Sequence, residues 1–337
     1  MSTARLGVTA DFRPVDGVDG PTSWGDIGLS ELAGHDVEWA FLDDSGGALT
    51  PADLEGLDAV LVGSSKVDAA SLDGVERLRL VARFGVGYDS VDVAACTAAG
   101  VAVTITPDGA RRPVAAATLA MVLAVQHNLV VKDALVREGR WGDKTRWHGQ
   151  GLTGASVGMV GLGNIGSEVL RLMAPFEVTA LAHDPHASPE HAASLGARLV
   201  AFDELLASSD VVVLTAALTS ETHHLIDEQA LATLKPGAIL VNMARGPLVD
   251  TDALVAALQD GRLSGAGLDV FETEPLPVDS PLTTLRNVVL SPHALSWTAE
   301  MALGNGRSAL HAVLAATSGK APEHLVDSSV LSHPRWT

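Results

Sequence analysis

The sequence predicts an α/β protein made of two Rossmann-like, doubly wound parallel-sheet domains with a cleft between them. Three observations support this prediction. Short apolar runs alternate with helical stretches, as expected for parallel strands that are covered on both faces. A glycine-rich turn joins one such run to a helix. At 337 residues, the chain is also too long for one small core.

The first part of the chain contains one complete alternating unit. Strands are predicted at 6–8, 37–42, 59–62, 78–83 and 101–106, with helices around 28–33, 67–72 and 91–98. Pro107-Asp108-Gly109 then indicates a turn. A long apolar helix is expected to begin at Pro113, as a first-turn proline, and to pass Val125. Another helix is expected from Leu129 to about residue 138.

The alternation restarts after residue 154. Strands are predicted at 156–160, 178–182, 211–214, 238–241, 265–268 and 288–290, with helices at 165–173, 189–195, 203–207, 250–259 and 298–316. The chain therefore contains a second doubly wound unit.

Charge and cysteine content exclude several classes of function. The 22 basic and 41 acidic residues leave a formal net charge of −19, which repels nucleic acids and anionic membranes, so neither is an expected partner. The single cysteine, Cys96, excludes a disulfide framework and is expected to be inert core. The longest apolar run, 113–125, is too short to span a bilayer, and no targeting segment is visible. We expect a soluble, cytoplasmic protein.

The glycine-rich turn predicts a dinucleotide site. It reads Gly161-Leu162-Gly163-Asn164-Ile165-Gly166 and lies between the predicted strand 156–160 and a helix. Gly161 would allow the tight turn, Gly163 would let the backbone approach a pyrophosphate, and Gly166 would let helix and strand pack closely.

Asp184 indicates which dinucleotide is bound. It lies 18 residues beyond Gly166 (184 − 166), at the end of the next predicted strand. A carboxylate there accepts hydrogen bonds from the ribose hydroxyls and repels the 2′-phosphate of NADP, and no Lys or Arg lies between His183 and Glu190. The sequence therefore favours NAD, the alternative being that Asp184 is only a turn residue.

Polar residues follow three further apolar strands. The segments are Val241-Asn242-Met243-Ala244-Arg245-Gly246, then Gly267-Leu268-Asp269-Val270-Phe271-Glu272-Thr273-Glu274-Pro275, then Leu290-Ser291-Pro292-His293. Ligands bind at this edge of an open α/β sheet. With Arg83-Phe84-Gly85-Val86-Gly87-Tyr88-Asp89 and the glycine motif, in this order, the chain resembles the D-isomer-specific 2-hydroxyacid dehydrogenases over nearly its whole length.

The resemblance implies an NAD-dependent oxidoreductase acting on 2-keto and D-2-hydroxy acids, with Arg245, Glu274 and His293 as catalytic residues. The chemistry suits these residue types. Arg offers a planar fork for a carboxylate and a carbonyl, and His can supply the proton that reduction needs. A carboxylate bonded to the other ring nitrogen orients the imidazole and favours its charged form. NADH delivers the hydride. Glu272 is the rival to Glu274, and Arg245 and His293 could instead be structural residues.

The resemblance also implies the remaining contacts. Cofactor contacts fall on Gly161, Gly163, Asn164, Ile165, Gly166, Asp184, Thr215, Ala216, Ala244 and Asp269, and substrate contacts fall on Phe84, Gly85, Val86, Gly87 and Trp297. Consecutive N–H groups at Gly85-Val86-Gly87 suit a carboxylate. The chain departs from many members at Ala116, where they have Glu, and at Thr215, where they have His. Arg111 and Arg112 could meet a second acidic group on the substrate, but solvated charges are the preferred interpretation.

The resemblance finally implies the domain division and the assembly. Residues 1–108 with 297–337 would bind substrate, residues 109–296 would bind NAD, and a homodimer would form through the NAD domains. No metal is expected, because the histidine group His183, His186 and His191 straddles a strand end and a loop. The alternative function is an NAD(H)-sensing binding protein of the corepressor type, without needed turnover.

Overall fold

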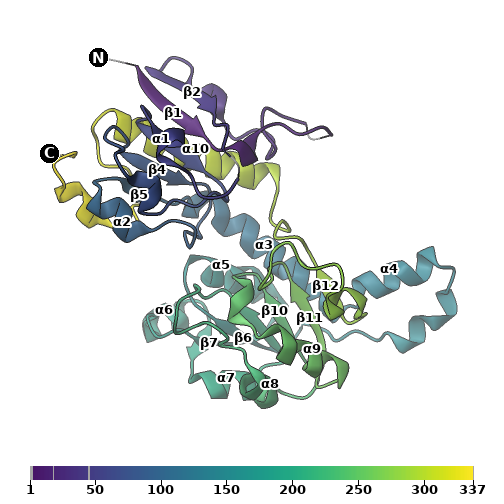
Figure 1. The fold of residues 1–337 in the computed structure, drawn as a ribbon. Coiled ribbons are helices and arrows are strands. Elements are labelled where there is room, and N and C mark those ends of the chain that lie inside the picture. The colour runs from purple at the N-terminus through teal and green to yellow at the C-terminus, as the bar shows by residue number, and fades with distance from the viewer. Residues whose placement is uncertain (1–2, 18, 45, 337) are drawn as a thin grey trace. The chain divides into compact units, whose positions relative to one another are not determined.

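The structure, a computed structural model, describes residues 3–17, 19–44 and 46–336. Residues 1–2, 18, 45 and 337, which fall in the predicted substrate-binding domain, lie outside the described residues. The chain divides into two compact units (Figure 1): unit 1 is Met1–Pro113 with Trp297–Thr337, and unit 2 is Val114–Ser296. Each unit contains one parallel sheet, which confirms the predicted fold class of two parallel-sheet α/β domains.

Unit 1 has a five-stranded parallel sheet in the order β2-β1-β3-β4-β5. The strands are β1 (Ala4–Val8), β2 (Val37–Phe41), β3 (Ala59–Val62), β4 (Leu80–Arg83) and β5 (Ala102–Thr104), and the helices are α1 (Pro51–Leu54), α2 (Val93–Ala98) and α10 (Ala299–Thr317). The C-terminal helix α10, coloured yellow-green in Figure 1, packs on β3 and β4 despite its distance in sequence. Its buried face joins the core of the N-terminal strands.

Unit 2 has a seven-stranded parallel sheet in the order β12-β11-β10-β9-β6-β7-β8. The strands are β6 (Ser156–Val160), β7 (Thr179–His183), β8 (Ala197–Leu199), β9 (Val211–Leu214), β10 (Ala238–Asn242), β11 (Leu263–Leu268) and β12 (Val288–Leu290). The helices are α4 (Leu129–Arg137), α5 (Asn164–Met173), α6 (Pro189–Ser194), α7 (Phe202–Ser208), α8 (Glu228–Thr233) and α9 (Thr251–Gln259). The strand order reverses between β6 and β9, and ligands bind at such a point.

Two predicted helices of unit 1 are wrong. Only short 3-10 turns form there, at Leu29–Leu32 and Ala70–Leu72. In the second case the Asp68 side chain accepts a hydrogen bond from the Ser71 backbone, which closes a local turn that competes with a longer helix. The short elements α1, α8 and β8 were not predicted. The signal for α1 was a capping box between Thr50 and Asp53 around Pro51.

The predicted start of the long helix is also wrong. Helix α3 spans Pro107–Gln126, so Pro107 begins it and Pro113 lies inside it. A proline inside a helix removes one N–H donor and crowds the carbonyl of the residue four positions earlier, here Gly109. This turn passes close to α10, where a Cβ on Gly109 would lie 2.3 Å from the Asn305 backbone nitrogen, so packing restricts the residue to glycine. The units divide directly after Pro113, five residues beyond residue 108 (113 − 108).

Cys96 is fully buried in α2, and burial, aided by the nearby charge of Asp92, raises the pKa of its thiol to about 12. The prediction that Cys96 is a core residue is confirmed. Within the described ranges, no single helix is long and apolar enough to cross a membrane. Only α3 and α4 taken together pass that test, and they are bent by 61°.

Candidate active site

The predicted functional residues of unit 2 follow neighbouring strands of its sheet. The glycine motif follows β6, Asp184 follows β7 and Thr215 follows β9. Arg245 follows β10, the loop with Glu274 follows β11, and His293 follows β12. Because all these strands are parallel, the residues lie along one edge of the sheet.

The glycine turn has the geometry that its three positions require. Gly161 has a φ of 96°, and a Cβ on it would lie 2.7 Å from the Ala216 backbone nitrogen. A Cβ on Gly166 would lie 2.3 Å from the Gly161 carbonyl oxygen. A Cβ on Gly163 would have nothing within 4 Å, and no side chain caps the start of α5 there. The helix N-terminus is therefore accessible to an anionic group such as a pyrophosphate.

Asp184 and Thr215 support this turn from the adjacent strands. Asp184 Oδ2 accepts a hydrogen bond from the Leu162 backbone at 2.7 Å, and its Oδ1 accepts one from the His186 backbone at 2.8 Å. Thr215 Oγ1 donates to the Gly161 carbonyl oxygen at 2.9 Å. Asp184 therefore anchors the glycine turn, a role that the sequence did not reveal, and its carboxylate retains lone pairs for ribose hydroxyls.

Arg245 is held by a short loop that the side chain of Asn242 organises. Asn242 is buried at the end of β10, where its Oδ1 accepts from the Ala244 backbone at 3.0 Å and its Nδ2 donates to the Arg245 carbonyl at 2.8 Å. Arg245 Nη1 donates to the Ala244 carbonyl at 2.8 Å. Sequence reasoning missed Asn242, although an amide at the end of a buried strand was the available signal.

His293 lies in a turn that a buried carboxylate stabilises. Its backbone has a φ of 55°, in the left-handed region. Asp269 Oδ1 accepts from the Ala294 and Leu295 backbones at 3.0 and 3.1 Å. Asp269, predicted to contact the cofactor, thus secures the chain directly after His293.

The structure brings Glu274 and His293 together. Glu274 Oε2 lies 2.8 Å from His293 Nδ1, and Glu274 Oε1 accepts from the Phe271 backbone at 2.9 Å. Partial burial would raise the pKa of Glu274. The hydrogen bonds from His293 and Phe271, with the charges of His293 and Arg245, outweigh it and hold that pKa below its usual range. Glu274 is therefore an anion at neutral pH.

The rival carboxylate, Glu272, has other partners. Its Oε1 lies 2.6 Å from His224 Nε2, and its Oε2 accepts from the Thr251 backbone at 2.8 Å. The two glutamates of this loop thus point to different histidines.

In unit 1, the predicted substrate loop follows β4. The Gly85 N–H donates to Thr106 Oγ1 at 2.7 Å, and the Gly85 carbonyl accepts from the Thr106 backbone at 2.9 Å. The Gly85 N–H is therefore already used within unit 1. The N–H groups of Val86 and Gly87 are the remaining candidate donors of this loop to a substrate carboxylate.

The aromatic residues of unit 1 differ in exposure. Phe84 is buried, with ring centroids 5.1 Å from Phe12 and 5.0 Å from Trp24. Trp297 is exposed and packs against Trp24, with the ring centroids 3.6 Å apart. The surroundings of Phe84 are those of a core residue, and Trp297 presents apolar surface.

Other polar residues have local roles. Arg111 and Arg112 are exposed on α3. His183 Nδ1 lies 3.1 Å from the Val200 carbonyl, and His191 Nε2 lies 2.9 Å from Ser167 Oγ. Across the described part of the chain, no group of three or more His, Cys, Asp or Glu could hold a metal ion.

Comparisons with known proteins agree with this geometry. Residues 119–294 match the family model described as D-isomer specific 2-hydroxyacid dehydrogenase, NAD binding domain. The chain is 40% identical to a glyoxylate reductase of Thermococcus onnurineus over 286 residues, which cover 83% of this chain and 85% of that protein.

Two further relatives extend the comparison. The chain is 42% identical over 288 residues to the D-3-phosphoglycerate dehydrogenase of Mycobacterium tuberculosis, covering 85% of this chain and 54% of that one. The crystal structure of D-lactate dehydrogenase from Aquifex aeolicus, complexed with NAD and lactic acid, superposes with a TM-score of 0.81 at 27% identity, covering 95% of this chain and 98% of that one.

Proposed function

The chain belongs to the D-isomer-specific 2-hydroxyacid dehydrogenase family, and we propose that Arg245, Glu274 and His293 carry the reaction of that family here. It is an NAD-dependent oxidoreductase that interconverts small 2-keto and 2-hydroxy acids. The observation that carries the assignment of residues is the 2.8 Å contact between His293 Nδ1 and Glu274 Oε2, which joins the loops after two neighbouring strands.

His293 is the proposed proton donor in reduction. Because Nδ1 faces Glu274, the transferable proton is held at Nε2, the other ring nitrogen. Glu274 is ionised and stabilises the imidazolium that gives this proton to the carbonyl oxygen. In the direction of oxidation the same nitrogen accepts the hydroxyl proton.

Arg245 is the proposed holder of the substrate. Its guanidinium stays charged and offers parallel N–H groups that match the carboxylate and the carbonyl oxygen of a 2-keto acid. Asn242 bonds to the Ala244 N–H and to the Arg245 carbonyl, which limits the movement of Arg245. The N–H groups of Val86 and Gly87 are the proposed second set of donors to the carboxylate.

The residues around the glycine turn fit NAD. The open space above Gly163 and the uncapped start of α5 suit the pyrophosphate, and Asp184 suits the adenosine ribose. We propose further contacts at Asn164, Ile165, Thr215, Ala216, Ala244 and Asp269. Bound NADH supplies the hydride for the carbonyl carbon. Asp184, with no cation between His183 and Glu190, favours NADH over NADPH.

We propose a small 2-keto acid as substrate, with glyoxylate as the first candidate because several relatives are named glyoxylate reductases. A panel of glyoxylate, hydroxypyruvate, pyruvate, phenylpyruvate and 2-ketoglutarate tests this proposal, with loss of NADH absorbance as the readout. Reduction of at least one compound, lost in His293→Gln, is the expected result. No reduction of any compound would contradict it. The relatives are named as enzymes, so the NAD(H)-sensing alternative gains no support.

We also propose a cytoplasmic homodimer formed through unit 2. Helix α4 stands away from the sheet of its unit (Figure 1) and exposes Leu129, Val130 and Val136, followed by the exposed Trp141. An apolar surface of this kind indicates a protein contact. Sedimentation of the wild type should give a mass twice that of the 34.8 kDa chain. Val136→Asp should lower the measured mass toward that of a single chain. A single-chain mass in the wild type would contradict the dimer.

A further inference from the structure

His224 connects two catalytic loops of unit 2. It lies between β9 and α8, and its backbone N–H donates to the Pro247 carbonyl at 2.8 Å. Its side-chain Nε2 lies 2.6 Å from Glu272 Oε1. Pro247 lies two residues after Arg245, and Glu272 lies two residues before Glu274. One residue therefore holds the loop of Arg245 and the loop of Glu274.

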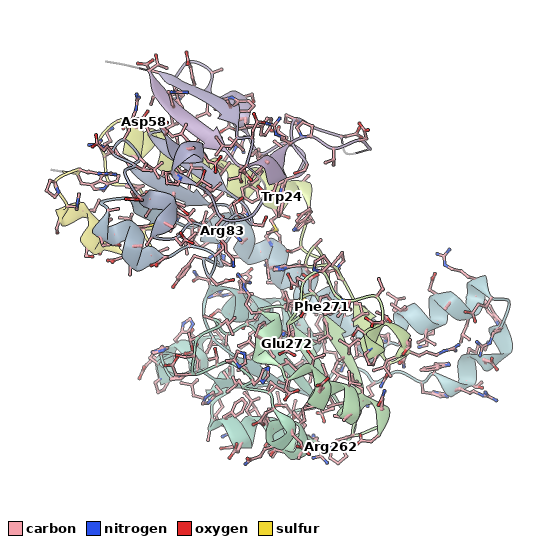
Figure 2. All side chains as sticks on the ribbon, viewed as in Figure 1. Trp24, Asp58, Arg83, Arg262, Phe271 and Glu272 are labelled. Atoms are coloured by element: carbon pink, nitrogen blue, oxygen red, sulfur yellow. The ribbon has the colours of Figure 1, made fainter. Side chains whose placement is uncertain are left out.

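The two loops also touch directly. A Cβ on Gly246 would lie 1.9 Å from the Phe271 carbonyl carbon and 2.4 Å from the Glu272 nitrogen, so only glycine permits this contact. Phe271 and Glu272 lie side by side on the loop after β11 (Figure 2). The Phe271 backbone in turn donates to Glu274 Oε1 at 2.9 Å. A displacement at Glu272 would therefore reach both catalytic side chains.

Glu272 is fixed at its other oxygen as well. Its Oε2 accepts from the Thr251 backbone at 2.8 Å, at the start of α9. Partial burial would raise the pKa of Glu272, but the hydrogen bonds of Thr251 and His224 and the charge of His224 hold it below its usual range. Two other groups face His224: Asp250 Oδ2 is 4.0 Å from its Nδ1, and the His223 ring stacks on it at 4.1 Å.

We propose that His224 and Glu272 are positioning residues, which hold the loops of Arg245 and Glu274 in the relative placement that keto-acid reduction requires. The inference rests on the proposed function, because it takes Arg245 and Glu274 as the catalytic pair of loops. Neither His224 nor Glu272 is required to touch the substrate. Their effect is on orientation, and a misplacement of about 1 Å can lower a rate about 100-fold.

Four variants and one control test the proposal. His224→Leu and Glu272→Ala each remove the contact, and the double variant removes both partners. His224→Gln restores an N–H donor near the place of Nε2. His223→Leu is the matched control: it removes the exposed ring that stacks on His224, and among the described residues that ring forms no hydrogen bond with Glu272. Each is assayed for kcat and KM with the best keto acid, for NADH affinity by fluorescence, and for Tm.

The proposal predicts a specific combination of results. His224→Leu and Glu272→Ala should lower kcat/KM about 10- to 100-fold, mainly in kcat, with NADH affinity unchanged. The double variant should be no slower than the worse single variant, because both remove one contact. His224→Gln should recover most of the loss, and His223→Leu should behave as wild type. The pH dependence of reduction should keep its midpoint, since the Glu274–His293 pair remains.

The proposal would be overturned by wild-type kcat/KM in His224→Leu, by additive losses in the double variant, or by an equal loss of NADH affinity. A lowered Tm with unchanged kcat would show a purely structural contact and would also overturn it. A wild type that reduces no keto acid would refute the proposed function instead. In that case the ¹H–¹⁵N spectrum of the imidazole rings decides, with His293 assigned from His293→Gln: a shifted His293 signal in His224→Leu supports the positioning role, and an unchanged signal refutes it.

Discussion

Replacing Glu274 by Gln tests the charge partner of the proposed acid. Gln has nearly the same size and can still bond to His293 Nδ1, but it carries no charge. In the wild type, Glu274 contributes its charge above its lowered pKa, and that contribution is lost as pH falls through this pKa. Glu274 is therefore an anion at neutral pH, and an anion beside the ring favours the imidazolium form. Reduction needs imidazolium, so it falls as pH rises, and the variant should lose activity at a lower pH.

The structure limits the strength of the interaction between the two side chains. The Nδ1–Oε2 distance is 2.8 Å, but the side chains of His293 and Glu274 are 47% and 38% exposed. Solvent screening at that exposure limits the interaction to about 1 kcal/mol. An interaction of that size should move the midpoint of reduction to lower pH in Glu274→Gln.

The assay is kcat/KM for the best keto acid as a function of pH, in the wild type and in Glu274→Gln. A kinetic isotope effect with deuterated NADH must first show that chemistry limits the rate. His293→Gln is the reference for loss of the acid. It should remove the fall of kcat/KM with rising pH and lower the rate by about 10²- to 10⁴-fold.

Two results would refute this reasoning. A midpoint unchanged in Glu274→Gln would show that the carboxylate does not act through its charge on His293. A midpoint that moves to higher pH would reverse the predicted sign. Glu272→Gln is the matched control on the same loop, and because Glu272 bonds to His224, it should leave the midpoint in place.

Three other predictions follow from the site. Arg245→Lys keeps the charge but loses the fork, so kcat/KM for the keto acid should fall about 100-fold while NADH binding, measured by fluorescence, is unchanged; near-normal turnover would exclude the role. Asp184→Ala should weaken NADH binding and reduce the difference in kcat/KM between NADH and NADPH in steady-state kinetics. Equal kcat/KM with both cofactors in the wild type would contradict this. Gly166→Ala would place a Cβ 2.3 Å from the Gly161 oxygen and 2.8 Å from Thr215 Oγ1. It should lower the free energy of unfolding by about 1–3 kcal/mol in a denaturant titration, and an unchanged midpoint would show that the turn can relax.

Much of the fold could be predicted because buried parallel strands have a strong local signal. The continuous apolar runs predicted eleven strands, and each of them forms in the two sheets. The errors fall where local signals compete with packing. Pro113 indicated a helix start, yet the helix begins at Pro107, and its first turn packs closely against α10 at Gly109. The first residue of α10, Ala299, lies 190 residues after Gly109 (299 − 109). The local sequence therefore could not show that these two segments pack together.

The sequence by itself determined the candidate residues of the site and the sheet edge on which they lie. The order of the motifs along the chain and the polar residues after apolar strands were sufficient for that, because parallel strands bring their carboxyl ends to one edge. Only the tertiary structure decided what each side chain contacts. Glu272 and Glu274 are two residues apart on one loop; the resemblance selected Glu274 as the partner of His293, and the residues alone left Glu272 as its rival. The loop backbone directs Glu274 to His293 and Glu272 to His224. The Gly85 N–H is likewise directed to Thr106, whose place beside it depends on the pairing of β4 with β5. Hydrogen-bond partners depend on distances of a fraction of an ångström between segments far apart in the chain, and those distances are fixed only when the whole core packs.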